Sequence, residues 1–426
     1  MLQMIAQHAV VTHSSAHGAP HERRGGWAVA LLCASFVVSW SIEPELFESG
    51  PSLAAAMRWI IVITMCMISP LVSLSGVGRC WSIIAFVGAI GLTIPFSGAL
   101  ESSFPIFARI LGAGVLAIFV GTLPFSQRIR VVRTLLFVIA ALVICSLLLS
   151  FISPERAYRA MGIRPRLYGL TPHPAILSYL ASLVATVFTS TALFTKARKM
   201  SRLRDGLLAV LSAVVIVMAD SRTGEIALPA ALLCQMAAFR LVKSRVLLRS
   251  IRLPWLTFAG AMVVCASLPI AVATRAIPVS IEENQYAGST QSRLAIWSLG
   301  LSDFEDNVIV GNGLGTAFIV DDPNADKNFL LYYHSVLINY LAKTGLIGAA
   351  GFVVLLLSAC YACLAYAQRI ARQRSFGESE MILLSFIVAA CSVTVAFATV
   401  EAALQNIYPS FLIFFLSITL PSRQLR

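Results

Sequence analysis

Charged residues are scarce in this chain. Asp, Glu, Lys and Arg make up 12% of its 426 residues, whereas hydrophobic residues make up 58%. Together with a mean hydropathy of +0.83, this composition excludes a water-soluble domain. The apolar runs also lack the alternation of barrel strands, and lipid cannot satisfy the edge of an open sheet. We therefore expect an all-α polytopic integral membrane protein.

Long apolar runs recur along the whole chain, most of them near the ~20 residues that a helix needs to cross a bilayer. They predict about twelve transmembrane helices. The predicted spans lie near 27–42, 53–74, 81–98, 104–123, 131–152, 174–194, 207–219, 226–239, 253–273, 345–366, 381–400 and 408–420.

The distribution of Lys and Arg predicts the orientation of these spans. Most of the 32 basic residues lie in alternate loops and tails, on the same side as both termini. Because short loops rich in Lys and Arg stay in the cytoplasm, we place both termini there. The long loops at about 154–173 and 274–333 are then periplasmic, and the larger one precedes the tenth helix. The net charge of +12 thus reflects topology and does not indicate a nucleic-acid partner.

Cysteine is absent from the predicted periplasmic loops, because all nine cysteines lie in or beside apolar runs. Disulfides are therefore not expected. Cys360 and Cys363 form a C-x-x-C pair inside a predicted span with no second pair, which favours packing over metal binding or redox chemistry. The acidic segment 321–326 lacks the glycine and glutamate of a calcium loop and the Asp-x-Asp spacing of metal-dependent transferases. We expect no metal site and no cofactor.

The polar N-terminal segment, residues 1–26, is not a cleavable signal, because no small-residue cleavage site follows the next apolar run. We expect a disordered cytoplasmic tail, with residues 27–426 forming a single transmembrane domain. Most of the histidines lie in this tail. Only His173 and His334 lie in the body of the chain, both on the predicted periplasmic side.

The basic residues outside the cytoplasmic loops are mostly arginines, although the positive-inside tendency opposes a periplasmic placement. An arginine fork binds phosphate oxygens in pairs, so a cluster at the outer surface suits a lipid-linked diphosphate. Pairing with outer carboxylates or snorkelling to lipid phosphates is the alternative for each one. The residues are Arg58, Arg109, Arg156, Arg159, Arg164, Arg166, Arg222, Arg275, Arg293, Lys327 and Lys343.

Three of these arginines lie in sharp or stiff segments. Arg222 belongs to a polar hairpin, 220–225, in which a carboxylate on either side is able to neutralise it. Arg164 and Arg166 belong to a stretch with three prolines that ends beside His173, just before the sixth span. A rigid outer loop of this kind suits contact with a ligand.

The larger periplasmic loop carries two further patterns. Arg293 to Leu299 predicts a short amphipathic helix that begins near Ser289 or Thr290, fades at 303–307 and is able to lie against the bilayer surface. The segment 311–315, with three glycines, predicts a turn. Its flanks are not those of a strand and a helix in a β-α-β unit, so tight backbone packing is favoured over phosphate binding.

His334 lies where this loop re-enters a hydrophobic span, in the sequence Tyr332-Tyr333-His334-Ser335. Histidine is the side chain that titrates near neutrality without help, so His334 is a candidate for proton transfer. The alternative is a histidine that caps the next helix or lies at the membrane interface.

These patterns together resemble the O-antigen ligase and polysaccharide polymerase (Wzy-type) superfamily of bacterial envelopes. The matching segment runs from about 206 to 365, with a weaker echo at 164–182. Lys343 is a departure, because related sequences often carry an acidic residue there. The motifs are Ser221-Arg222-Thr223 at a hairpin, Arg293 with Trp297, Gly311-x-Gly-x-Gly315, and His334-Ser335-x9-Gly345-x-x-Gly348.

The resemblance implies a metal-independent, inverting glycosyltransferase of the C-type membrane fold class, located in the bacterial inner membrane. A glycan on undecaprenyl diphosphate would move, on the periplasmic face, to a hydroxyl of another glycan or of lipid A core. His334 is then the expected base or acceptor-orienting residue. Arg222 and Arg293 are the expected diphosphate ligands, with Arg164 and Arg166 behind them. His173 and Lys343 are expected to make further donor or acceptor contacts.

Two alternatives stay open at this point. A polymerase and a ligase share donor chemistry and differ in the acceptor, so the sequence does not choose between them. A twelve-span secondary transporter or lipid flippase is an alternative from another class. Such transporters usually show two related halves and ionisable residues near mid-membrane. This chain has no visible repeat and concentrates its unusual charges at the outer edge, which favours the enzyme.

Overall fold

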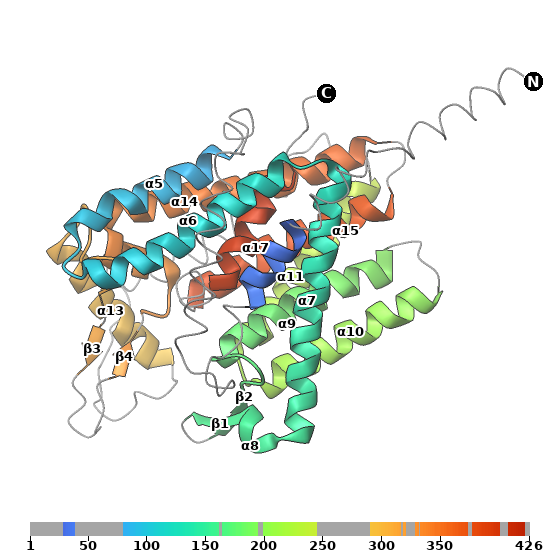
Figure 1. Cartoon of the computed structure of the whole chain (residues 1–426), viewed down its shortest axis with the longest axis horizontal. Helices are drawn as coiled ribbons and strands as arrows, with labels where there is room; N and C mark the ends of the chain where they lie inside the picture. Colours follow the sequence, from blue (N-terminus) through green and yellow to red (C-terminus); the bar gives the residue numbers. More distant parts are fainter. Residues whose placement is uncertain are drawn as a thin grey trace, which may run out of the picture.

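The computed structural model describes residues 29–38, 80–161, 164–194, 199–244, 290–316, 318–320, 329–331, 333–373, 377–400 and 408–421. Within these ranges the chain is a bundle of helices with two short β-hairpins (Figure 1). The predicted tail, 1–26, and the predicted spans near 53–74 and 253–273 lie outside the described residues. Every other predicted span coincides with a helix.

The first described helix covers Val29–Val38. The helices and strands that follow are α5 (Trp81–Thr93), η3 (Ile94–Phe96), α6 (Leu100–Thr122), α7 (Phe125–Ile152), α8 (Pro154–Ala157), β1 (Tyr158–Met161), β2 (Arg164–Leu167), α9 (Pro174–Phe194), α10 (Lys199–Met218), α11 (Arg222–Ser244), α13 (Thr290–Asp306), β3 (Phe318–Val320), β4 (Phe329–Leu331), α14 (Val336–Arg372), α15 (Glu378–Val400) and α17 (Tyr408–Thr419).

Five of these helices, α6, α7, α9, α14 and α15, are long and apolar enough to cross a membrane. Shorter apolar helices cover Val29–Val38, Trp81–Phe96 and Pro409–Thr419. The chain is thus a helical, polytopic membrane protein, as expected. The count of about twelve spans and their sidedness stay predictions.

Helix boundaries differ most from the prediction in α10, α11 and α14. The first two extend beyond the apolar runs at 207–219 and 226–239, because charged residues near the membrane surface continue the helix. The predicted span 345–366 was wrong at its start: α14 begins at Val336, and Gly345 lies at a kink inside it. The two β-hairpins in the predicted periplasmic loops were also not expected.

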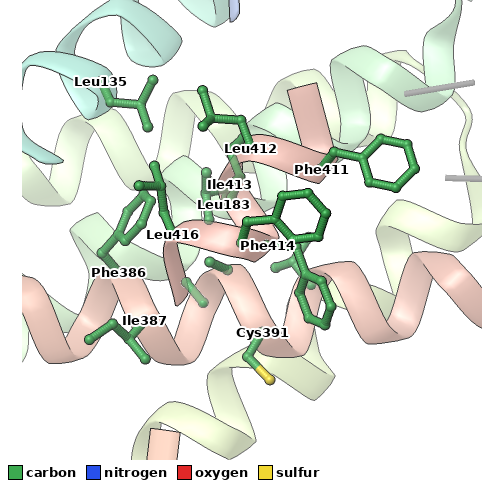
Figure 2. Packing of buried hydrophobic residues seen from close by; sticks show 14 of the residues in the cluster. Leu135, Leu183, Phe386, Ile387, Cys391, Phe411, Leu412, Ile413, Phe414 and Leu416 are labelled. Atoms are coloured by element: carbon green, nitrogen blue, oxygen red, sulfur yellow. The ribbon is translucent and has the colours of Figure 1, made fainter. Parts of the chain in front are cut away.

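The interior of the bundle is formed by α9, α15 and α17. In α9 and α15, 78% and 83%, respectively, of the most apolar stretch is buried. In α14 only 44% of this stretch is buried, which leaves a face for lipid. Figure 2 shows Phe414 and Leu416 of α17 in one packed cluster with Phe386 and Cys391 of α15. Since α17 is only 12 residues long and its described side chains from Pro409 onward are buried, it is a core element rather than a peripheral one.

The basic ends of several helices lie together. Arg128 at the start of α7 donates through Nη1 to the carbonyl of Leu420, just after α17, at 2.6 Å. Arg133, one turn further along α7, donates to Ser379 at the start of α15 at 3.5 Å. These contacts bring helix ends that were predicted to be cytoplasmic to one end of the bundle, as a positive-inside topology requires.

Candidate functional site

The segment that leads into α14 packs against α13. Ile296 and Trp297 of α13 form a compact buried cluster with Tyr333, Ile338 and Ala342. The predicted start and end of α13 are confirmed, because the helix runs from Thr290 to Asp306. Its buried side chains lie against α14, which ties the larger predicted periplasmic loop to the helix that follows it.

His334 lies directly beside this cluster. Its backbone has a φ of 47°, in the left-handed region that non-glycine residues rarely adopt. Ser335, the next residue, is the N-cap of α14, and its carbonyl accepts from the N–H of Asn339 at 3.0 Å. His334 is half-buried and precedes the cap, so the interpretation of His334 as the helix-capping residue is not supported by this geometry.

Helix α14 is broken at Gly345, ten residues after Ser335. Gly345 has a non-helical conformation, with φ 60° and ψ −160°. In a continuous α-helix, the N–H groups of Leu346 and Ile347 would donate to the carbonyls of Ala342 and Lys343. The break separates these partners. Two donors and two acceptors inside a membrane-spanning helix therefore need replacement partners.

The turn that follows α13 supplies all four partners. It crosses the break and pairs with both sides of it, so the helix ladder is replaced by bonds to another segment. The bonds, donor first, run from Leu346 to Val308 at 2.8 Å, Ile347 to Ile309 at 3.3 Å, Asn312 to Ala342 at 3.0 Å and Gly313 to Lys343 at 2.8 Å.

Glycine is required where the two backbones meet. Gly311 and Gly345 have φ values of +68° and +60°. A Cβ on Gly311 would lie 2.4 Å from the carbonyl carbon of Lys343, and one on Gly345 would lie 2.3 Å from the carbonyl oxygen of Ile309. The tight backbone packing predicted for the glycine-rich turn is confirmed.

The same turn is also bound to the start of α6. The N–H of Gly315 donates to Ser103 Oγ at 2.8 Å, and Ser102 Oγ donates to the carbonyl of Gly315 at 2.9 Å. Ser97 and Ser103 share a further hydrogen bond of 2.8 Å. The serines of the α5–α6 connection had not been predicted to matter, because their partner lies over two hundred residues away along the chain.

A second group of predicted site residues lies at the β1–β2 hairpin and the α10–α11 turn. Arg166 of β2 lies 3.5 Å from Asp220 of the turn, measured from Nε to Oδ2. Ser221 caps the start of α11, since its Oγ accepts from the N–H of Gly224 at 3.4 Å. Arg222 is therefore the first residue of the helix, and its side chain is exposed. Asp220, one of the two carboxylates that the sequence offered as alternative partners for Arg222, pairs with Arg166.

His173 has a structural partner in the same region. Its Nδ1 accepts from the N–H of Ala175 at 3.1 Å, so the ring holds the start of α9. The ring also meets Tyr168 edge-on, with centroids 6.3 Å apart. Arg159 lies directly opposite Arg166 in the hairpin. Its guanidinium carbon lies over the Tyr168 ring, 5.4 Å from the ring centroid.

The remaining predicted site residues are located by the helix or strand to which each belongs. Arg164 is the first residue of β2, paired with Met161, and Arg293 lies in the first turn of α13. Lys343 lies two residues before the helix break and is 5% exposed. Among the described residues, no group of three or more His, Cys, Asp and Glu side chains suits a metal ion.

The structure thus joins these residues in two groups. The first contains His334, α13 and the helix break, and the second contains Arg166 and the turn that carries Arg222. In Figure 1, α13 lies at the left of the bundle, and β1 and β2 lie at its lower edge. Asp303 and its contact with Tyr333 were missed, because no sequence motif marks a pair 30 residues apart.

Residues 207–353 match the family model described as O-antigen ligase. The match begins in α10 and runs through α11 and α13 to the part of α14 beyond the break, so it contains both the Arg222 turn and His334. A search among curated proteins gives no match to the chain. The helix break, the glycine-rich turn that fills it and His334 all lie in this matched segment, so this part of the chain is similar to the O-antigen ligase family.

Proposed function

We propose that this protein transfers a glycan from undecaprenyl diphosphate to an acceptor hydroxyl at the periplasmic face of the bacterial inner membrane. The family implies a glycosyl-transferring enzyme that uses a lipid-linked donor in a membrane. The observation that carries the finer proposal is that the matched segment holds His334 directly before the cap of α14, in a constrained backbone conformation.

His334 is assigned as the base or acceptor-orienting residue. The acceptor oxygen attacks the anomeric carbon while the bond from that carbon to the diphosphate breaks, which inverts the configuration. The acceptor proton passes to the imidazole. A positioned base contributes about 10²- to 10⁴-fold to such a step.

Arg222 is assigned to the diphosphate leaving group. It is exposed, it lies at the N-terminus of α11, and the neighbouring carboxylate of Asp220 is engaged by Arg166. The partial positive charge at a helix N-terminus and the guanidinium both favour an anion there. Preorganised donors of this kind stabilise the charge that develops on the diphosphate.

The other assignments support the same chemistry. Arg293, Arg164 and Arg166 are proposed as further diphosphate donors, with no metal required. His173 and Lys343 are proposed as additional donor or acceptor contacts, although each also has a structural place, His173 at the start of α9 and Lys343 at the helix break. The acceptor is a glycan for a polymerase and lipid A core for a ligase.

The test uses purified protein in liposomes with undecaprenyl-diphosphate glycan, separate glycan and lipid A-core acceptors, no nucleotide, and a chelator. Transfer to one acceptor supports the proposal and distinguishes a polymerase from a ligase. Movement of the lipid-linked donor between leaflets without transfer would instead support the flippase alternative. A strict need for a divalent metal or ATP would contradict the mechanism.

A further inference from the structure

A hydrogen bond joins α13 to the residue before His334. The hydroxyl of Tyr333 donates to the carboxylate of Asp303. The Tyr333 ring is buried in the cluster with Trp297, and it lies directly over α13 at Gly300. A Cβ on Gly300 would lie 2.6 Å from this ring, so the glycine permits the close approach.

Asp303 is itself held in place by the turn that fills the helix break. Its carbonyl accepts from Asn312 Nδ2 at 2.9 Å, and the backbone N–H of Asn312 donates to Ala342 of α14 at 3.0 Å. The backbone of Asp303, from which the carboxylate projects, is therefore held relative to α14. The bond of this carboxylate to Tyr333 closes a ring of contacts from α14, through the turn and α13, back to the start of α14.

His334 lies between Tyr333, which closes this ring of contacts, and Ser335, which caps α14. A left-handed backbone costs free energy at a non-glycine residue and persists only where the surroundings hold it. On one side, Ser335 begins α14. On the other, the Tyr333 ring and hydroxyl are both fastened to α13. Loss of the hydroxyl bond would therefore remove one of the contacts that hold the N-terminal side of His334.

We propose that Asp303 is a positioning residue, which fixes Tyr333 and thereby holds His334 in the orientation that glycan transfer needs. The inference rests on the proposed role of His334. Asp303 acts through Tyr333 and does not touch the substrate. Its loss changes the rate of transfer and leaves the binding of the lipid-linked donor unchanged.

A double-mutant cycle tests this inference. Tyr333→Phe keeps the ring in the cluster and removes the hydroxyl, and Asp303→Ala removes the acceptor. Each is expected to lower kcat, by up to about 100-fold, because small misplacements of a reacting group have effects of this size. The donor KM should stay within about twofold of wild type, because the donor-binding arginines are untouched. The double variant should be no slower than the slower single variant, because both changes remove the same bond.

Asp303→Asn provides the rescue. Its amide oxygen still accepts from Tyr333, so most of kcat should return. Glu305→Ala is the matched control, because this carboxylate is also near the end of α13 but is exposed. It should leave kcat unchanged. The unfolding temperature of each variant distinguishes a misplaced His334 from a protein that no longer folds.

Four outcomes decide the question. Wild-type kcat in Tyr333→Phe and Asp303→Ala overturns the inference, as does an additive loss that follows the unfolding temperature and is not rescued by Asp303→Asn. If His334→Ala keeps wild-type transfer, the proposed function fails whatever the cycle shows. If His334→Ala is inactive while Tyr333→Phe and Asp303→Ala are fully active, only the role of Asp303 fails.

Discussion

The backbone N–H of Gly313 donates to the carbonyl of Lys343 at 2.8 Å, a carbonyl that would accept from Ile347 in an unbroken helix. The predicted periplasmic loop is therefore part of the hydrogen-bonding of α14. Since the same turn is bonded to Ser102 and Ser103 of α6, the loop, the kinked helix and the α5–α6 connection form one unit.

Gly345→Ala should destabilise the protein by about 3 kcal/mol or more, because its backbone conformation, with φ 60° and ψ −160°, is essentially restricted to glycine and costs another residue about 1–3 kcal/mol, and overpacking adds about 1–3. Its Cβ would lie 2.3 Å from the carbonyl oxygen of Ile309. The control is Gly88→Ala, where a Cβ meets nothing within 4 Å. Thermal unfolding in detergent measures both. Equal unfolding temperatures for the two variants would show that the helix break tolerates a side chain.

Arg222→Lys should raise the donor KM by about 10- to 100-fold, because a point charge does not reproduce a bidentate fork and a hydrogen bond to a charged group is worth about 1.5–3 kcal/mol. Initial rates at varied lipid-linked donor measure this. Arg204→Lys is the control, since Arg204 pairs with Asp205 at the N-terminal end of α10, away from the Arg222 turn. An unchanged donor KM in Arg222→Lys would remove Arg222 from the donor site.

Reporter fusions test the topology. A phosphatase fused within 280–330 should be active and a cytoplasmic reporter there silent, because the Lys/Arg alternation places this loop in the periplasm. A fusion at residues 196–204, where basic residues cluster, should give the opposite result. A cytoplasmic signal from 280–330 would overturn the assignment of the active face.

Asp303→Asn should change how stability depends on pH. Burial raises the pKa of the Asp303 carboxyl above its usual range, and the hydrogen bond from Tyr333 opposes this only in part. The folded protein thus holds this proton more tightly than the unfolded chain. The contribution to stability is complete below the ordinary pKa of about 3.9 and is lost as pH rises through the higher folded pKa.

Unfolding temperatures measured from about pH 4 upward test this, because the window begins at the ordinary Asp pKa. The difference between wild type and Asp303→Asn should shift in favour of the variant as pH rises through the window, and then stay constant toward neutrality. A difference that does not vary with pH would mean that Asp303 titrates alike in both states.

Much of the helical architecture was predictable, because a helix that crosses a membrane needs a long apolar run, which is visible in the sequence. The glycines of 311–315 correctly indicated tight packing, but not the partner. The apolar run at 345–366 predicted a span that starts at Gly345. In the structure the break is filled by another segment, and the helix begins at Val336.

The contacts that shape the candidate site were less predictable, for a physical reason. Backbone hydrogen bonds between Gly313 and Lys343, and the bond between Tyr333 and Asp303, join residues 30 positions apart and impose no period on the side chains. Likewise, the pairing of Asp220 with Arg166 depends on the fold of the β1–β2 hairpin. In the sequence, Asp220 was one of two carboxylates able to neutralise Arg222.

The transfer rate of His334→Ala tests the central claim most directly. Purified wild type and variant are compared in liposomes with undecaprenyl-diphosphate glycan and acceptor, without nucleotide and with chelator. The variant should lose most transfer, about 10²- to 10⁴-fold, while membrane insertion and binding of the lipid-linked donor stay intact, because the arginines bind the donor. Near wild-type turnover by His334→Ala would contradict the account.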